Sequence, residues 1–237
     1  MREQAADTGQ TRRAFWRGFA AALPLQLATV PFGLIFGIVA VETGLDLGQI
    51  AGFTLIVLAG ASSLVAMELI QEQAPALIIV AAGAMVNLRM AMYSAALVPH
   101  WQGAGWQPRL AAGYMLNDQT YTISLKAYQE GRFASLPQRI AYFFGAGACT
   151  IPGWSAPVVV GVALGTQIPP EWGLEMAAPA LFLALSAPLI RTPAHMVAFT
   201  VAMAAALPAA ALPQGVGVIA ASIVGIGAGM AARRVLA

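Results

Sequence analysis

The chain has 237 residues, of which 59% are hydrophobic and 9% are charged, and its formal net charge is +2 at pH 7. A soluble domain carries about 25% charged residues, so this composition excludes an ordinary soluble protein and indicates an integral membrane protein. One cysteine, Cys149, excludes an internal disulfide, and two distant histidines, His100 and His195, give no metal-ligand spacing.

Apolar segments long enough to cross a bilayer recur along the whole chain. A membrane helix needs about 20 mainly apolar residues. We therefore expect an all-α, polytopic fold of about eight transmembrane helices, forming a single transmembrane transporter domain over residues 1–237. The predicted spans are 18–41, 49–70, 75–98, 109–128, 138–165, 174–190, 193–212 and 215–232.

The first and fifth predicted spans each contain two prolines. Pro24 and Pro31 lie in the first, and Pro152 and Pro157 lie in the fifth. Proline removes a helix donor and frees a carbonyl upstream, so we expect both spans to be broken. Transporters use broken helices to expose backbone groups to substrate near the midplane, which makes Pro31, together with Gly33, a candidate part of a substrate site.

The two proline-containing spans also resemble each other. Proline is followed by glycines at four-residue spacing after Pro31 and again after Pro157. This pattern suggests a weak internal repeat, about 18–98 and 138–212, although small-xxx-small spacing is also ordinary helix packing.

Small residues form the sequence AGASS, residues 59–63, in the second span. Such residues let another backbone approach closely, or they leave room for a ligand. Ser62 and Ser63 are therefore candidates for substrate contact, with helix packing as the alternative role.

Arg89 lies in the middle of the third span. A charge near the bilayer centre costs at least ~2.5–3.5 kcal/mol on insertion scales, and such residues usually face a partner or a watery cavity. Arg89 therefore either links helices or lines a substrate path, and snorkelling to the surface is a third alternative. On a regular helix Tyr93 shares the face of Arg89, whereas Asn87 points nearly the opposite way.

The fourth span has the most polar centre, NDQTY, residues 117–121. A carboxylate inside a membrane is a candidate for proton relay or for binding a substrate amine. Asp118 is that carboxylate, with Asn117 and Tyr121 as neighbouring candidates. The alternatives are a structural ion pair with Arg89, and a loop outside the membrane. If Arg89 and Asp118 face one site, they complement the two charges of an amino acid zwitterion.

Basic residues predict the orientation of the spans, because Lys and Arg favour the cytoplasmic side. With a cytoplasmic N-terminus and eight spans, ten of the twelve basic residues lie inside, and the C-terminus is cytoplasmic as well. The exceptions are Arg109, which this topology places outside, and Arg89 within a span. The ten are Arg2, Arg12, Arg13, Arg17, Lys126, Arg132, Arg139, Arg191, Arg233 and Arg234.

Sequence signatures of enzymes are missing. The chain contains neither the P-loop pattern GxxxxGK[ST] nor HExxH. We therefore expect no enzymatic activity and no cofactor, and neither a metal nor a nucleic-acid partner.

Several motifs together resemble the AzlC family, the large subunit of branched-chain amino acid exporters. They are VPFGLIFG at 30–37, LAGASS at 58–63, VNLRMAMYSAALVPH at 86–100, YMLNDQTY at 114–121, YFFGAGACTIPGW at 142–154, APALFLALSAPLI at 178–190 and LPQGVGVI at 212–219. The resemblance implies a multi-pass protein of the bacterial inner membrane that exports branched-chain amino acids and works with a small AzlD-type membrane subunit.

Three departures from the family pattern remove polar or titratable groups. This chain has Met90 where the family commonly has histidine, Gln119 where it often has glutamate, and Ser63 where it commonly has glutamine. The substrate can therefore differ from leucine, isoleucine or valine. Proton coupling through Asp118 is a further hypothesis, and a non-transporting scaffold or assembly subunit is the alternative function.

Overall fold

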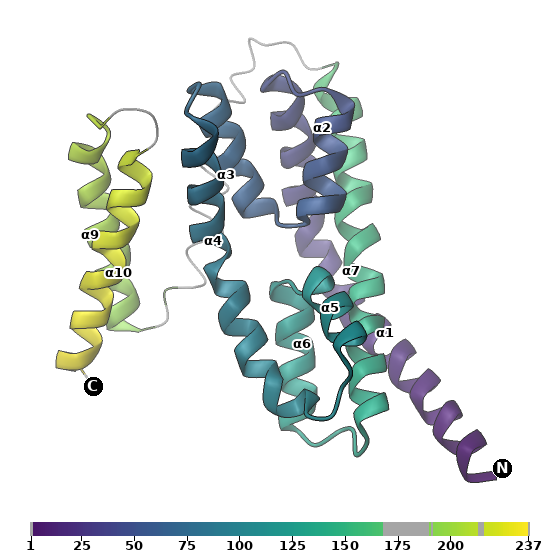
Figure 1. The fold of residues 1–237 in the computed structure, drawn as a ribbon. Coiled ribbons are helices and arrows are strands. Elements are labelled where there is room, and N and C mark those ends of the chain that lie inside the picture. Colours follow the sequence, from purple (N-terminus) through teal and green to yellow (C-terminus); the bar gives the residue numbers. More distant parts are fainter. Residues whose placement is uncertain (1, 168–189, 191, 213–215, 237) are drawn as a thin grey trace. The chain divides into compact units, whose positions relative to one another are not determined.

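The computed structural model of the protein describes residues 2–167, 190, 192–212 and 216–236. Every regular element in these ranges is a helix, which confirms the all-α prediction. Predicted span 174–190 lies outside the described residues except for Ile190. The helices are α1 (Arg2–Glu42), α2 (Leu47–Ala51), the π-helix η1 (Gly52–Val57), α3 (Gly60–Gln71), α4 (Ala76–Leu97), the 3-10 helix η2 (Val98–Trp101), α5 (Trp106–Met115), α6 (Asp118–Gln129), α7 (Leu136–Gly165), α9 (Pro193–Ala209) and α10 (Val216–Leu236) (Figure 1).

Four helical segments of the described chain are long and apolar enough to cross a membrane. They are Thr8–Glu42, Ala76–Trp101, Leu136–Gly165 and Val216–Val235. Two shorter apolar helical segments accompany them, Leu47–Val57 and Pro193–Ala209.

The chain divides into two compact units. Unit 1 comprises residues 1–41, 45–60 and 87–167. Unit 2 comprises residues 42–44, 61–86 and 168–237. The charged and polar candidates around Asp118 all belong to unit 1.

The proline-containing helices are continuous, so the prediction that they are broken is wrong. α1 stays helical from Arg2 to Glu42 through Pro24 and Pro31, and α7 stays helical from Leu136 to Gly165 through Pro152 and Pro157. Membrane helices tolerate proline because neighbouring groups and small local adjustments satisfy the freed backbone groups.

Within unit 1, α1 and α7 run side by side in the same direction (Figure 1). Glycines on both helices allow the approach. A Cβ on Gly145 of α7 would lie 1.9 Å from the Phe15 carbonyl oxygen, and one on Gly161 would lie 2.2 Å from that of Leu34. From α1, a Cβ on Gly37 would lie 2.3 Å from the Val158 carbonyl oxygen. The two backbones therefore touch along most of their shared length, as small residues permit in membranes.

An aromatic cluster adds to the contact between α1 and α7. Trp154 of α7 packs against Phe32 and Phe36 of α1, with ring centroids 5.2 and 5.1 Å apart. Trp154 is buried, and the ring of Phe36 is fully enclosed. These rings fill the space beside the glycine contacts.

The segment that contains α5 and α6 does not cross the membrane. The ring of His100, before α5, packs at a tilt against that of Tyr128, near the end of α6, with centroids 5.3 Å apart, and the His100 carbonyl accepts a hydrogen bond from Arg139 at the start of α7. A straight helix over the 24 residues 106–129, from the start of α5 to the end of α6, would separate its ends by about 36 Å. The chain instead doubles back between Met115 and Asp118, as Figure 1 shows. The prediction that 109–128 is a span is wrong, and α5 with α6 forms a re-entrant hairpin.

Depth follows from helix length. The ten residues of α5 and the twelve of α6 rise about 15 and 18 Å, roughly half of a ~30 Å hydrocarbon core. With the start of α7 at the membrane surface, as the basic residues there predict, the tip of the hairpin at Leu116 and Asn117 would reach mid-depth. Non-helical backbone is tolerated there only when protein or a wet cavity surrounds it.

The segment between α1 and α4 doubles back as well. Gln71, the last residue of α3, donates a hydrogen bond to Thr43, directly after α1, at 3.3 Å. The intervening residues therefore start and finish at one end, and predicted span 49–70 does not cross. The interruption lies at Leu58, whose φ of +50° is left-handed, a conformation that leucine rarely adopts.

Because α5 and α6 fold back in this way, Arg109 no longer lies on the opposite side from the other basic residues of unit 1. Arg109 donates to the Trp101 carbonyl at 3.2 Å, and Arg139 donates to the neighbouring His100 carbonyl. Arg109 thus lies at the end of unit 1 where α7 begins. Gln138 of α7 also bonds Gln10 of α1 at 2.7 Å. We call this the basic end of unit 1; its basic residues are Arg12, Arg13, Arg17, Arg109, Lys126, Arg132 and Arg139.

The connections after α1 and after α3 carry acidic residues, in contrast to the basic end of unit 1. Residues 43–46 and 72–75 contain Asp46 and Glu72 and no basic residue. The eight-span topology places the connections near 43–46 and 71–74 on opposite sides of the membrane, but the hydrogen bond between Gln71 and Thr43 brings them together at one end of α1. That part of the topology is therefore wrong. A cytoplasmic N-terminus and C-terminus stay predictions.

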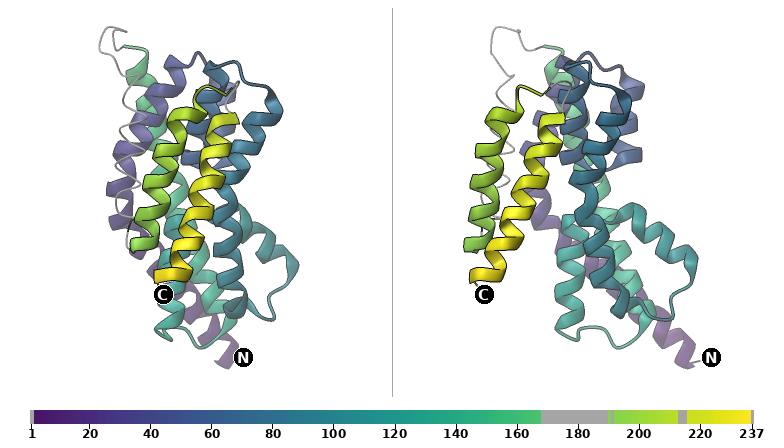
Figure 2. Two further views of the ribbon diagram at one scale, coloured as in Figure 1. Left: turned by 90° about the vertical axis from the view of Figure 1, so that its left-hand side faces the viewer. Right: turned by 60° about the vertical axis from the view of Figure 1, so that its left-hand side comes forward.

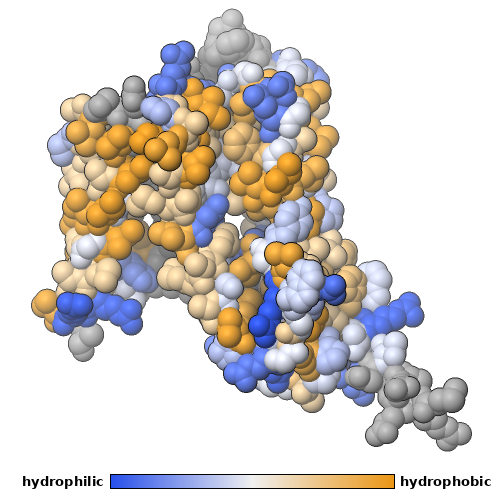
Figure 3. All heavy atoms as spheres, in the orientation of Figure 1, coloured by the Kyte–Doolittle hydropathy of each residue, from blue (hydrophilic) through white to orange (hydrophobic). Residues whose placement is uncertain are grey.

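In unit 2, α9 and α10 form a tightly packed antiparallel pair (Figure 2). A Cβ on Gly225 would lie 2.6 Å from that of Ala202, and one on Gly229 would lie 2.8 Å from that of Ala198. On the face shown in Figure 3, hydrophobic side chains cover this pair, and hydrophilic atoms gather at its lower end. Arg233 and Arg234 lie in the last turn of α10. Both features suit a membrane helix, α10, with its end in water.

Candidate functional site

The tip of the re-entrant hairpin is built by a helix cap. The Asn117 side-chain oxygen accepts hydrogen bonds from the backbone N–H groups of Gln119 and Thr120, at 3.1 and 2.9 Å. The Thr120 hydroxyl accepts one from the Asn117 N–H at 2.9 Å. This capping box satisfies donors at the start of α6, and it fixes Asp118 in the first turn.

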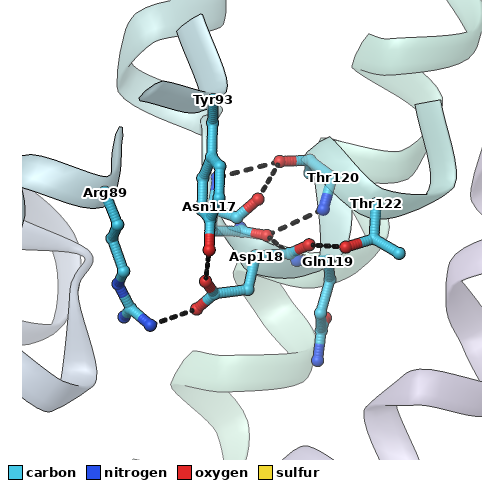
Figure 4. Close-up of polar contacts among 7 residues, drawn as sticks. All are labelled: Arg89, Tyr93, Asn117, Asp118, Gln119, Thr120 and Thr122. Carbon is cyan, nitrogen blue, oxygen red and sulfur yellow. Dashed lines mark hydrogen bonds and ion pairs between the residues drawn. The ribbon is translucent and has the colours of Figure 1, made fainter. Parts of the chain in front are cut away.

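Asp118 pairs with two side chains of α4 (Figure 4). Its Oδ2 lies 3.1 Å from an Nη of Arg89, and its Oδ1 accepts a hydrogen bond from the Tyr93 hydroxyl at 2.7 Å. Arg89 and Tyr93 are four residues apart, so they stand one above the other on a helix. The structure confirms that they share a face, and it brings Arg89 and Asp118 together.

The ion pair is only partly enclosed by the described residues. The Arg89 and Asp118 side chains are 29% and 49% exposed, so another molecule can reach both charges. The Arg89 Nε is itself buried and has no hydrogen-bond partner in the described part of the chain. Arg89 therefore keeps donor capacity that Asp118 does not use.

An aromatic stack supports the ion pair. The Tyr93 and Tyr121 rings lie 4.1 Å apart at 12°. Tyr121 lies on α6, one turn after Asp118. The stack joins α4 to α6 and holds the Tyr93 hydroxyl against the carboxylate.

Uncharged polar groups connect the tip to α1 and α7. The Gln119 amide donates to Thr29 and to the Leu25 carbonyl of α1, and it accepts a hydrogen bond from Gln26 at 2.8 Å. The Asn117 amide donates to Thr150 of α7 at 3.3 Å. Sequence reasoning missed Gln26, Thr29 and Thr150. Their signal was the same as that of Arg89, a polar residue inside an apolar run.

The two interruptions of the fold contact each other in unit 1. The Tyr114 hydroxyl, in the last turn of α5, donates a hydrogen bond to the Leu55 carbonyl of η1. Leu55 stands three residues before the left-handed Leu58. The end of α5 and the end of η1 therefore meet, and each is followed by non-helical backbone.

Other predicted site residues take different places. Asn87 lies on α4, which is unbroken there, so Asn87 and Arg89 point in nearly opposite directions. Ser62 and Ser63 are buried in the first turn of α3, in unit 2. Gly33 packs against α7, since a Cβ there would lie 2.8 Å from the Cβ of Pro157. Pro31 stands half a turn earlier on the same helix.

The chemistry of the site is that of ion binding and recognition. It offers a guanidinium, a carboxylate, two phenols and neighbouring side-chain amides. No group of three or more metal-ligating side chains exists among the described residues. The arrangement can therefore bind a small molecule that carries both a negative and a positive group.

Removal of the Tyr93 hydroxyl tests the geometry of the pair. We expect Tyr93→Phe to lower the free energy of unfolding by about 1.5 kcal/mol, because a hydrogen bond to a charged group is lost, while the stack on Tyr121 stays. Tyr121→Phe is the matched control, since its hydroxyl makes no hydrogen bond with a described residue. Thermal unfolding in detergent measures both. Equal melting temperatures for the two variants would contradict the geometry.

Comparison with known proteins gives consistent results. The family model described as AzlC protein matches residues 24–168. Two relatives are both called "Uncharacterized membrane protein" and come from Helicobacter pylori strains ATCC 700392 / 26695 and J99 / ATCC 700824. They are 26% and 24% identical over 176 residues, which is 73% of this chain and 74% of each relative. No solved structure matches the chain. Because the family model covers more than half of the sequence, the chain belongs to the AzlC family, a family of membrane transport proteins.

Proposed function

We propose that the protein is a secondary transporter that exports branched-chain or similarly apolar amino acids across the bacterial inner membrane. It would act as the large subunit of a two-component exporter, together with a small AzlD-like membrane subunit. The single observation that supports this most is the accessible Arg89–Asp118 pair beside the hairpin tip. Family membership supports transport in general.

In the proposed binding mode, the ion pair between Arg89 and Asp118 is replaced by two ion pairs, one between each side chain and the substrate. The substrate carboxylate would meet Arg89, which has donors to spare, and the substrate ammonium would meet Asp118. Each protein charge keeps an opposite charge beside it throughout, so neither is left uncompensated in a medium of low dielectric constant. An apolar side chain would contact the hydrophobic walls of the surrounding helices.

Backbone at the tip adds to this site. The start of α6 carries a partial positive charge, and Asp118 stands in its first turn. Discontinuous helices in other transporters bring such ends to the substrate at the midplane. Movement of the α5–α6 hairpin relative to α4 would break and remake the Arg89–Asp118 contact during each transport cycle. Proton coupling through Asp118 is part of this proposal, because Asp118 is the acidic residue in the polar centre of the hairpin segment.

Reconstitution into liposomes tests the proposed function. The chain is purified with and without an AzlD-like small subunit, and the liposomes are loaded with unlabelled leucine. We expect counterflow of radiolabelled leucine, isoleucine and valine, and little of glutamate or lysine, whose side chains add a third charge. An imposed proton gradient should drive net accumulation.

One result would overturn the proposed function, and a second would overturn only the coupling role of Asp118. Absence of counterflow for every amino acid, with the small subunit present, would favour the scaffold role. Counterflow that does not respond to a proton gradient in wild-type protein, and equally not in Asp118→Asn, would remove the coupling role of Asp118 alone.

A further inference from the structure

A cavity lies on the basic-end side of the hairpin tip, inside unit 1. Its volume is about 120 Å³, and it lies between α5 and the last turns of α4, with the ring of Phe143 of α7 as one wall. Leu97, Trp101 and Phe143 are buried, so these walls are firm. Trp101 and Phe143 pack edge to face at 5.4 Å, which fixes both rings.

The lining of the cavity is apolar except at two places. Leu97, Val98, Ala112 and Leu116 supply hydrocarbon, whereas Ser94 supplies a hydroxyl and Arg109 a guanidinium. One Nη of Arg109 is held by the Trp101 carbonyl at 3.2 Å. Arg109 is otherwise exposed, so its remaining donors can meet an anion at the rim.

The cavity is continuous in sequence with the Asp118 site. Ser94 directly follows Tyr93, and Leu116 directly precedes Asn117. The cavity and the Asp118 site therefore share α4 and the hairpin tip. Trp101 and Arg109, which line the cavity, lie at the basic end of unit 1, which is the cytoplasmic side by the charge rule.

Volume limits the occupant. An apolar cavity of about 150 Å³ holds a benzene-sized ligand. A volume of about 120 Å³ thus suits the three or four carbons of a valine, leucine or isoleucine side chain, and it is too small for an indole or a lipid acyl chain.

We propose that this cavity is a second substrate subsite, where an exported amino acid first binds from the cytoplasm. The aliphatic side chain enters the cavity, and the α-carboxylate pairs with Arg109 before the molecule moves to Arg89 and Asp118. This inference rests on the proposed export function. It makes Ala112 and Arg109 determinants of substrate affinity.

Adjacent alanines on α5 provide a matched test. Ala112 lines the cavity and Ala111 does not. We expect Ala112→Leu to weaken equilibrium binding of radiolabelled leucine to the purified protein at least ten-fold, because three added carbons fill most of the space. Glycine has no side chain to place in the cavity, so its affinity, measured by competition against leucine, should be the same in Ala112→Leu and in wild-type protein. Ala111→Leu should leave leucine binding unchanged. Thermal unfolding verifies that both variants fold.

A second variant tests the carboxylate contact independently of the filled cavity. Arg109→Gln should weaken leucine binding at least five-fold and leave binding of 3-methylbutylamine, which lacks the carboxylate, unchanged. If Ala112→Leu does not fold, the binding measurements on Arg109→Gln test the subsite instead, and unchanged leucine binding would overturn it.

The outcomes separate this inference from the transport function. Equal leucine affinity in Ala112→Leu and Ala111→Leu overturns the subsite, even if wild-type protein performs counterflow. A selective loss in Ala112→Leu supports the subsite, even if counterflow fails. Absence of leucine binding to wild-type protein overturns both.

Discussion

Asp118→Leu is expected to lower the stability and the membrane abundance of the protein, and Arg89→Met is expected to restore both when added to it. The single change leaves the Arg89 guanidinium without its carboxylate partner, 3.1 Å away in the native protein. An unpaired arginine at mid-depth costs about 3 kcal/mol, a large part of a total stability of about 5–15 kcal/mol. Replacing both charges by apolar residues of similar size is often neutral.

The comparison is made on purified protein and on membranes. Thermal unfolding in detergent gives the stability, and immunoblotting of membranes gives the abundance. Arg89→Met alone is the reciprocal control, and it should also be destabilising, because Asp118 then keeps only the Tyr93 hydroxyl. A double variant no more stable than Asp118→Leu would contradict pairing as the reason for the loss.

The second large effect is expected from glycines where α1 and α7 touch. Gly145→Ala would place a methyl group 1.9 Å from a backbone carbonyl oxygen of α1, and Gly161→Ala would place one 2.2 Å from another. Backbone cannot rotate away as a side chain can, so the helices must separate. Overpacking costs about 1–3 kcal/mol per site. The sites are about 24 Å apart along α7, so their costs should add to about 2–6 kcal/mol.

Two other glycines control for the change of residue type. A Cβ on Gly83 of α4 or on Gly227 of α10 meets no described atom within 4 Å. Gly83→Ala and Gly227→Ala should be neutral or stabilising by up to about 1 kcal/mol, since alanine favours helix. Melting temperatures in detergent compare all variants. A Gly145→Ala, Gly161→Ala double variant as stable as these controls would show that α1 and α7 do not touch.

Hydropathy located most helical segments, but it could not tell a crossing helix from a re-entrant pair. About 20 apolar residues satisfy either arrangement. The fourth predicted span proved to be two short helices around Asn117. Two clues were present in the sequence: the polar centre NDQT, and Arg109, the one basic residue that the eight-span topology put outside.

Interruptions were predicted at the wrong residues for a physical reason. Proline was expected to break α1 and α7, yet both helices continue through it. The break at Leu58 has no local signal, because leucine is an unusual residue for a left-handed conformation. Only tertiary contacts, such as that between Gln71 and Thr43, reveal that the chain turns there.

The charged pair was the part of the site most open to prediction. A charge in an apolar segment requires a partner, and Arg89 with Asp118 was the obvious combination. The amides of Gln26 and Gln119 and the hydroxyl of Thr150 were less predictable, because uncharged polar residues are tolerated singly in membrane helices. The internal repeat stays a prediction.

We propose that Arg89 and Asp118 bind the transported amino acid as well as each other. Counterflow of radiolabelled leucine by the Arg89→Met, Asp118→Leu double variant separates transport from stability. We expect a folded protein whose leucine counterflow is at least a hundred-fold below that of wild type. Counterflow at the wild-type rate would show that the pair only holds the helices together.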